Sequence, residues 1–304
     1  MSVDITLATE PNVPPTLDTH PDFSSPNADV LLRSSDDVLF RVSSDLLCHA
    51  SGWFATMFTL PQGSNADRVT EPIPMGEPSA TLSALLSIVH GRSLPPLDQV
   101  DDLERLLASA EKYEVPMVIS VVRLAFASRL IDIAPLRLYG IAYRMRWEAE
   151  AKDASSRTLT QDLLAPEAQA ELAAMAPRHR DLLLDLHRRR REEFFDGLDD
   201  TTSFYANTRG GPCTGQIGDG DNLKPCSASL DHGHWWALKY ALMRQWRHKP
   251  YDGQLDETFH YMPEVKDVTF AKCPQCGKTL YAMGATLVNI NDIIRKLPRC
   301  VDWL

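Results

Sequence analysis

Two short stretches near the start of the chain place apolar residues at every second position, which is typical of β-strands with one apolar face. Apolar side chains take every second position in residues 30–33 and again in residues 38–42, so each stretch presents one apolar face. The four residues between them, 34–37, are Ser, Ser, Asp and Asp, which favour tight turns. The pattern therefore predicts a β-hairpin with one buried face.

Helical periodicity replaces this alternation after residue 42. Ser43, Ser44 and Asp45 are residues that commonly begin a helix, and they precede the apolar pair Leu46-Leu47. Ser51 then begins a second short helix. Its apolar residues recur at helical spacing and form one stripe, made of Trp53, Phe54, Met57 and Phe58.

This opening segment closely resembles the start of a BTB/POZ domain. The likeness is carried by Ala28-Asp29-Val30, Leu39-Phe40-Arg41-Val42, Leu46-Leu47, Ala50-Ser51 and Phe54-Ala55-Thr56-Met57-Phe58. Residues 58–62, Phe-Thr-Leu-Pro-Gln, are similar to the segment that often follows the second helix in BTB proteins of fungi. The resemblance covers residues 25–130. It implies an α+β fold of short strands and helical hairpins, and a role in protein–protein interaction.

The pattern of residues 73–130 fits the same resemblance with lower specificity. Ile73-Pro74 is typical of a third short strand, and amphipathic helices follow it. The first runs from Ser79 to the stop signal Gly91, the next ends at Val115, and a third begins at Pro116.

Four regions are predicted along the chain. Residues 1–24 are acidic and lack an apolar run, so we expect a disordered segment that is not a secretory signal. Residues 25–130 form the BTB/POZ-like domain. Residues 131–200 contain helices without a strand pattern and are a helical extension, and residues 201–304 form a Cys/His zinc-binding helical unit.

Composition limits the partners and the compartment. A net charge of -10 and a pI near 5.4 disfavour nucleic acid and anionic membranes, which require a positive surface. No stretch approaches the roughly 20 apolar residues of a membrane span. Six cysteines in 304 residues, two of them in Cys273-Pro-Gln-Cys276, indicate a reducing compartment and a bound metal. We expect an intracellular protein, in the cytoplasm or the nucleus.

The cysteines predict a structural Zn²⁺ in the last third of the chain. Cys273 and Cys276 have the spacing of a zinc knuckle, in which one tight turn presents two thiolates. A tetrahedral site needs a second pair, and Cys213 and Cys226 are favoured because a proline precedes each.

Two histidines keep the identity of the second pair open. The twelve residues between Cys213 and Cys226 are many for one knuckle, so His234 or His232 is an alternative to Cys213. Any four of these six side chains satisfy the chemistry of a closed zinc site.

Three other motifs favour structural interpretations. The run His187-Arg-Arg-Arg-Arg191 followed by two glutamates predicts a solvated helix face, with nuclear import or RNA binding as the alternative. The Gly-rich residues 215–222 lack the signatures of phosphate and calcium loops and predict a plain flexible loop. Trp235, Trp236 and Trp246 lie at helical spacing and are interpreted as core anchors.

The chain carries no catalytic motif, neither a nucleophile elbow, nor a His-Glu-x-x-His helix, nor a dinucleotide fingerprint. We therefore predict no enzymatic activity, no catalytic residues and no bound organic cofactor. The predicted function is that of an interaction or scaffold protein that forms a homodimer through its BTB-like domain.

Two alternative functions remain open. One is a transcription or chromatin regulator, and the other is a substrate adaptor, because some BTB domains recruit a cullin-type ubiquitin ligase. Such adaptors carry a hydrophobic-x-Glu element before the third strand. Residues 60–70 show no convincing match, and Met75-Gly76-Glu77 fits but follows that strand.

Overall fold

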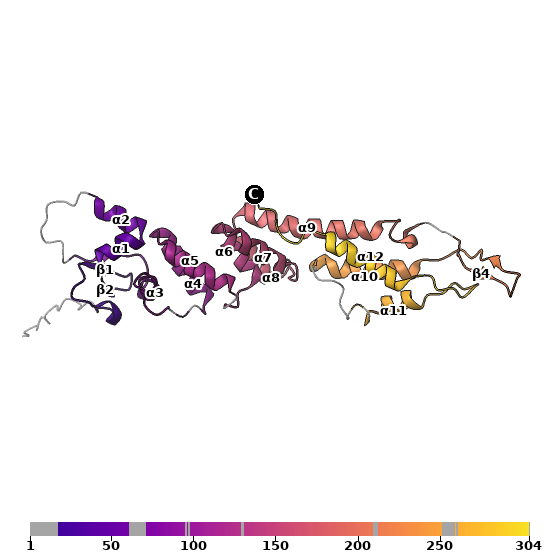
Figure 1. The fold of residues 1–304 in the computed structure, drawn as a ribbon, viewed down its shortest axis with the longest axis horizontal. Helices are drawn as coiled ribbons and strands as arrows, with labels where there is room; N and C mark the ends of the chain where they lie inside the picture. Colours follow the sequence, from indigo (N-terminus) through magenta and orange to yellow (C-terminus); the bar gives the residue numbers. More distant parts are fainter. Residues whose placement is uncertain are drawn as a thin grey trace, which may run out of the picture. The chain divides into compact units, whose positions relative to one another are not determined.

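The computed structural model describes residues 18–60, 71–94, 96, 98–128, 131–208, 212–250, 259 and 261–303. The chain divides into two compact units, Met1–Asp132 and Ile133–Leu304, and both are drawn in Figure 1. No helix of the described residues is long and apolar enough to cross a membrane.

The first unit contains the predicted hairpin and third strand. Strands β1 (Val30–Arg33) and β2 (Leu39–Val42) pair antiparallel, and β3 (Ile73–Pro74) pairs parallel with β1, which gives the order β2-β1-β3. The turn between β1 and β2 includes Asp37 at φ 64°, a backbone conformation that Asp tolerates better than most residues. Leu32 and Phe40 face each other across the hairpin and are fully buried, so the predicted apolar face is the core face.

Ordered structure begins before the predicted boundary at residue 25. Residues 1–17 lie outside the described part, but the short 3-10 helix η1 (Pro21–Phe23) belongs to the first unit. The Phe23 side chain is 1% exposed and packs its ring 5.6 Å from that of Phe40. Burial of this aromatic side chain holds the segment in place. The sequence gives no sign of this contact, because the residues around Phe23 are mostly polar.

Five helices complete the first unit. They are α1 (Ser44–Ala50), α2 (Gly52–Thr59), α3 (Ser79–Val89), α4 (Val100–Lys112) and α5 (Pro116–Ala127). Ser51 caps α2 as its residue type suggests, because its hydroxyl accepts a 3.1 Å hydrogen bond from the Phe54 amide. Ser79 does not cap α3: it is the first helical residue, and its amide and hydroxyl both donate to Asp36 in the hairpin turn.

The described residues of the second unit form helices and one small hairpin. Its helices are α6 (Pro135–Arg144), α7 (Glu148–Thr158), α8 (Pro166–Ala174), α9 (Pro177–Asp199), α10 (Gly233–His248), α11 (Pro263–Phe270) and α12 (Met283–Lys296), with the 3-10 helix η2 (Tyr205–Asn207) between α9 and the hairpin. Figure 1 shows α9 running beside α10 and α12, which both contact it. The predicted division at residue 200 falls at the end of α9, within this compact unit, and remains a prediction.

Two local sequence patterns of this unit do not match the structure. Residues 268–270, which suggest a strand by their β-branched and aromatic types, form the last turn of α11, where Val265 and Val268 are buried together one helical turn apart. Of the three tryptophans of α10, Trp235 and Trp246 are buried in the core, but Trp236 is 49% exposed. Adjacent residues of a helix lie about 100° apart around its axis, and Trp236 falls outside the side of α10 that faces this core, so only two of the three tryptophans are core anchors.

The arginine run of α9 is divided between core and surface. Arg190 is fully buried: its Nε donates to the Pro250 carbonyl at 2.9 Å and its Nη1 donates to the Pro298 carbonyl at 2.7 Å. Its guanidinium also lies 5.6 Å from the centre of the Trp246 ring. The prediction of a wholly solvated face is therefore wrong at this position.

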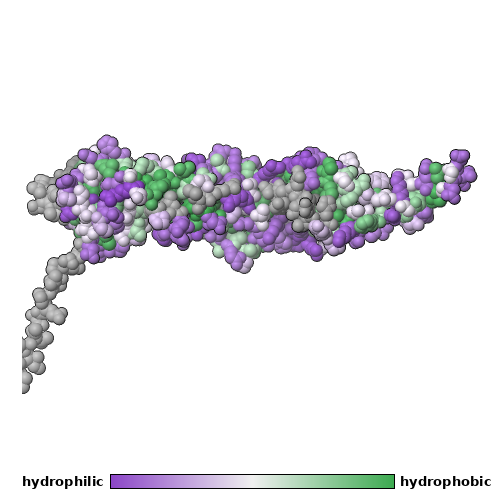
Figure 2. Space-filling model, turned by 60° about the horizontal axis from the view of Figure 1, so that its bottom comes forward, coloured by the Kyte–Doolittle hydropathy of each residue, from purple (hydrophilic) through white to green (hydrophobic). Residues whose placement is uncertain are grey.

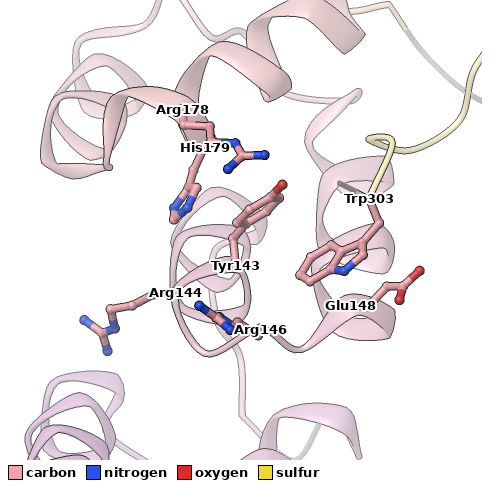
Figure 3. Close-up of a pocket in the computed structure, with 7 residues that line it drawn as sticks. All are labelled: Tyr143, Arg144, Arg146, Glu148, Arg178, His179 and Trp303. Atoms are coloured by element: carbon pink, nitrogen blue, oxygen red, sulfur yellow. The ribbon is translucent and has the colours of Figure 1, made fainter.

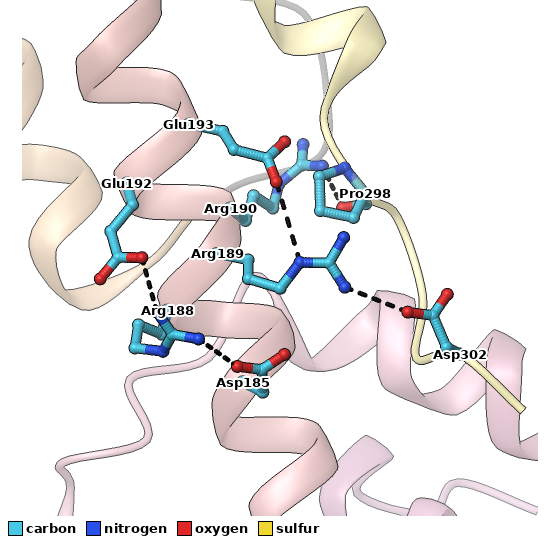
Figure 4. Close-up of polar contacts among 8 residues, drawn as sticks. All are labelled: Asp185, Arg188, Arg189, Arg190, Glu192, Glu193, Pro298 and Asp302. Carbon is cyan, nitrogen blue, oxygen red and sulfur yellow. Dashed lines mark hydrogen bonds and ion pairs between the residues drawn. The ribbon is translucent and has the colours of Figure 1, made fainter. Parts of the chain in front are cut away.

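Arg188 and Arg189, which precede the buried arginine, reach solvent and form the ion pairs drawn in Figure 4. Arg188 pairs with Asp185 and with Glu192, at 2.7 Å from the latter, and Arg189 pairs with Asp302 at 3.0 Å. The pairs of Arg188 lie within one turn of α9, and the pair of Arg189 joins the helix to Asp302 near the end of the described chain. Exposed ion pairs of this kind contribute little stability.

Replacing Arg190 by Met is expected to destabilise the second unit. The two carbonyls would stay buried without a donor, at roughly 1–3 kcal/mol each, so the free energy of unfolding should fall by about 2–5 kcal/mol. Arg189→Met, on the exposed side of the same helix, should change it by less than about 1 kcal/mol. Urea unfolding followed by tryptophan fluorescence measures this, because five of the six tryptophans lie after residue 132. Equal decreases in the free energy of unfolding of the two variants would contradict the stabilising role of the buried Arg190.

Candidate metal centre

The first half of the cysteine cluster is built on a β-hairpin. Strand β4 (Gln216–Ile217) pairs antiparallel with β5 (Lys224–Pro225), and a bridge between Pro212 and Ser229 extends the ladder to the base of the hairpin. The Gly-rich residues predicted to form a plain loop are thus β4 and the turn that follows it. This hairpin also accounts for the long spacing in the sequence, because its two strands bring residues 213 and 226 back together.

Backbone hydrogen bonds fix the positions of both hairpin cysteines. The Cys213 amide donates to the Ala228 carbonyl at 2.9 Å, and the Cys226 amide donates to the Gly215 carbonyl at 2.8 Å. The two thiols therefore lie near the base of the hairpin, Cys213 on one strand and Cys226 on the other. Both side chains are buried in a small apolar cluster that also contains Cys273.

The second half is the tight turn that the Cys-x-x-Cys spacing predicts. The Gly277 amide donates to the Cys273 carbonyl at 2.9 Å, and the Cys273 amide donates to the Lys278 carbonyl at 2.8 Å. Gly277 takes φ 68°, which costs glycine little and other residues more. Lys278 also donates from its Nζ to the Thr214 hydroxyl at 3.0 Å, so the turn and the hairpin are held side by side.

The four sulfur atoms converge on one point. Cys213, Cys226, Cys273 and Cys276 each offer a Sγ, and all four Sγ atoms lie within 4.8 Å of one another. The Cys213–Cys276 and Cys226–Cys273 separations are 3.5 and 3.8 Å, and all six cysteines of the chain are free thiols. Four sulfurs bound to a tetrahedral zinc at about 2.3 Å would lie about 3.8 Å apart, so the spacing fits such an ion.

The thiols of the cluster do not ionise alike. The amides of Cys276 and then Gln275 donate to Cys273 and lower the pKa of its thiol to about 6, despite its burial. At Cys213 the Gly215 amide acts in the same direction, but burial and the neighbouring thiols outweigh it and raise the pKa to about 12. Once one thiolate has formed, further negative charge is disfavoured in the same small volume. A divalent cation among the sulfurs would remove that repulsion.

The two histidines lie away from the sulfurs. His234 is exposed in the first turn of α10 and is not among the four grouped ligands. His232 is buried beside the helix, where its Nδ1 is 3.1 Å from the Tyr281 hydroxyl. Of the alternatives that spacing alone leaves open, the geometry brings together the four cysteines. These four are therefore the ligands that we consider for a metal ion.

A close approach at Gly215 is a feature that sequence reasoning did not identify. Its amide donates to the Cys213 sulfur at 3.3 Å, and a Cβ added to Gly215 would overlap the Cys276 sulfur. Glycine at this place therefore allows the hairpin backbone to lie against both halves of the cluster. Without the fold, nothing distinguishes Gly215 from the other glycines of the hairpin.

Comparison with known proteins concerns the first unit. Residues 23–128 match the family model of the BTB/POZ domain. The first unit is therefore a BTB/POZ domain, a class of module that commonly homodimerises, binds other proteins such as cullins and is typically not enzymatic. A search of curated protein sequences finds no significant match to the chain.

Replacing Gly215 by Ala should weaken metal binding without unfolding the helices. The new methyl group would push the hairpin away from Cys276, and a disturbance next to the ligands is expected to lower metal affinity by about 10–100-fold. Gly284→Ala is the matched control, because a Cβ there meets no atom within 4 Å. Titration of the apo-protein with Co²⁺, followed by its thiolate absorption, measures both affinities. Equal affinities would contradict the close packing at Gly215.

Proposed function

We propose that this protein is a protein–protein interaction or scaffold protein. Its BTB/POZ domain forms a homodimer, and its second unit, stabilised by a structural zinc ion, presents further binding surface. The observation that carries the proposal is the BTB/POZ match over residues 23–128, on a unit whose short strands and helix pairs follow the order expected from the sequence. The chemistry of such a protein is recognition, so no turnover is expected from either unit.

A groove in the first unit supports self-association. It has a volume of about 720 Å³ and lies against β1, β3 and the first two helices. Its apolar wall includes Val30, Met57, Phe58 and Ile73, and all four side chains are only half-buried. The stripe on α2 is therefore larger than the core of one domain covers. Figure 2 shows hydrophobic patches among polar residues on the visible face of this unit. A second copy of the domain is the occupant we propose.

The proposed zinc ion has a structural role. The four cysteines are ligands enough for a closed tetrahedral site, which leaves no coordination position for a substrate. The ion would join the hairpin at residues 212–229 to the turn at residues 272–279, two segments separated by α10 and α11. Thiolate ligands of this kind persist in a reducing compartment, which supports an intracellular location, in the cytoplasm or nucleus.

The cullin-adaptor alternative receives no support from Met75-Gly76-Glu77. Glu77 accepts a hydrogen bond from Lys112 at 2.8 Å and another from the Tyr113 hydroxyl. Its carboxylate is thus engaged within the domain rather than presented to a partner. Residues 61–70, where such an element would precede β3, lie outside the described part of the chain. The regulator alternative depends on which proteins the chain binds. Affinity purification with mass spectrometry would identify these partners.

The dimer can be tested by a charge placed on the apolar stripe of α2. Met57→Lys would place an ammonium group where about 1.5–3 kcal/mol of apolar burial is expected, so dimerisation should weaken roughly 10–100-fold. Thr56→Lys, at the adjacent exposed position, should leave it unchanged. Light scattering of the full chain of 34.0 kDa over a range of concentrations gives the dissociation constants. A monomer at tens of micromolar would exclude the proposed dimer.

The zinc ion can be tested by removing one sulfur. Elemental analysis of the purified chain should find about one zinc per chain, and Cys273→Ser should lose it. Because ligand binding stabilises the folded state, the loss should lower the thermal midpoint of the second unit and leave the BTB/POZ domain folded. Cys48→Ser removes a thiol from the first unit and is the control. Retention of zinc by Cys273→Ser, or its absence from the native chain, would refute the site.

A further inference from the structure

A second cavity lies in the helical unit, far in sequence from the cysteines. It has a volume of about 650 Å³ and is formed where α6 ends, where α7 and α9 begin, and where the chain passes Trp303. Figure 3 shows its lining, which consists of Tyr143, Arg144, Arg146, Glu148, Arg178, His179 and Trp303.

The lining presents cations that no described residue neutralises. The side chains of Arg144, Arg146 and Arg178 are exposed, and their guanidinium groups form no hydrogen bond or ion pair with any residue that the structure describes. By contrast, Arg188 and Arg189 of α9 are each paired with carboxylates. The carboxylate of the lining, Glu148, is engaged by Lys152 at 2.6 Å. The cavity is therefore a concentration of free positive charge.

This charge is local rather than general. Residues 133–304 contain 23 Lys and Arg and 23 Asp and Glu, and the net charge of -10 arises entirely from residues 1–132. A protein that attracts nucleic acid along its backbone carries a basic stripe over a whole face. Here a unit that is neutral overall holds three of its unpaired arginines around one cavity, which favours a single compact anion.

The remaining polar groups of the cavity are also hydrogen-bond donors. Tyr143 is nearly buried, and its ring packs 4.2 Å from that of His179 and 4.8 Å from that of Trp303. Neither the Tyr143 hydroxyl nor the Trp303 indole N–H has a hydrogen-bond partner among the described residues. In Figure 3, Arg178 and Arg146 lie on opposite sides of Tyr143, whereas Arg144 points away from it.

The backbone adds to the positive potential. Helices α7 and α9 both begin at the cavity, and neither has a side-chain cap on its first amides. Helix N-termini attract anions. The last carbonyls of α6, which would oppose this effect, are occupied: those of Ile141, Ala142 and Tyr143 accept from the amides of residues 145–147.

Arg146 is held in an unfavourable backbone conformation. Its φ is 58°, directly after the end of α6, where helices commonly place glycine. A long side chain in this conformation costs on the order of 1 kcal/mol or more. The fold nevertheless places an arginine there, and its side chain reaches the cavity.

We propose that this cavity binds a phosphorylated side chain of a partner polypeptide. A phosphoryl group carries nearly two negative charges and three acceptor oxygens, which suit a cavity lined by the unpaired Arg146 and Arg178 and by the free hydroxyl and indole donors. The cavity is much larger than a phosphoryl group, so it also accommodates the side chain that carries it, against Tyr143 and Trp303. The proposal rests on the proposed interaction function and gives the chemistry of one partner.

Binding is measured by fluorescence anisotropy with labelled peptide mixtures of degenerate sequence around one fixed central residue. The fixed residue is phosphotyrosine or phosphoserine in two mixtures, and tyrosine, serine or glutamate in three others. The phosphorylated mixtures should bind the full chain at least tenfold more tightly than their unphosphorylated counterparts. The phosphorylated mixture that binds more tightly shows whether the cavity prefers phosphotyrosine or phosphoserine. Similar affinities for all five mixtures would overturn the proposal.

Two variants locate the binding. Arg146→Gln combined with Arg178→Gln should weaken phosphopeptide binding at least tenfold. Arg180→Gln is the control and should leave binding unchanged, because Arg180 lies in α9 near Arg178 but pairs with Asp181. Unaltered zinc content and thermal midpoint would show that the double variant is folded. Unchanged phosphopeptide binding by this variant would overturn the assignment to the cavity.

Competitors distinguish the sources of the anion. Inorganic phosphate should compete weakly, because it leaves the aromatic walls uncovered. Displacement by a single-stranded RNA oligonucleotide at concentrations below those of the phosphopeptide would replace this proposal with nucleic-acid binding. Failure of phosphopeptide binding in a dimeric, zinc-containing protein would overturn only this inference and leave the proposed function standing.

Discussion

A buried guanidinium must find hydrogen-bond acceptors, and the helical unit is arranged around that requirement at Arg190. This side chain lies in the middle of α9, and its acceptors are the carbonyls of Pro250 and Pro298, which follow α10 and α12. Both prolines end segments that pack along α9. Because a buried unpaired charge is far more costly than a paired one, the three helices are held in one relative arrangement.

The cysteine cluster applies a similar constraint at the opposite end of α10. Four thiols lie within 4.8 Å of one another, and they come from two segments that would otherwise be loops. Few apolar residues surround them, so the small cluster at residues 213–280 has little core of its own. A metal ion held by the four sulfurs would therefore supply much of the free energy that orders these segments. This is the physical reason for proposing a metal with a structural role.

The two units differ in the kind of surface they offer. Residues 1–132 carry the acidic excess of the chain, and the BTB/POZ domain within them has a partly apolar groove, which suits association through buried apolar area. The helical unit is neutral overall but gathers unpaired arginines in one cavity, which suits recognition of a specific anion. Affinity from one unit and chemical selectivity from the other are compatible with a scaffold that joins two kinds of partner.

Local sequence determined much of this protein. The apolar spacing in residues 30–42, the serine ahead of α2 and the proline that begins α5 predict elements that the structure contains, because these features act over a few residues. The Cys-x-x-Cys turn was also predictable for that reason.

Only tertiary structure decided which residues meet across long separations. It pairs the hairpin cysteines with residues 273 and 276, buries Arg190 but not Arg189, and folds residues 268–270 as helix. It also gathers Arg146, Arg178 and Trp303 in one cavity. Such choices depend on the burial and hydrogen-bond partners that the whole chain provides, and no short stretch of sequence contains them.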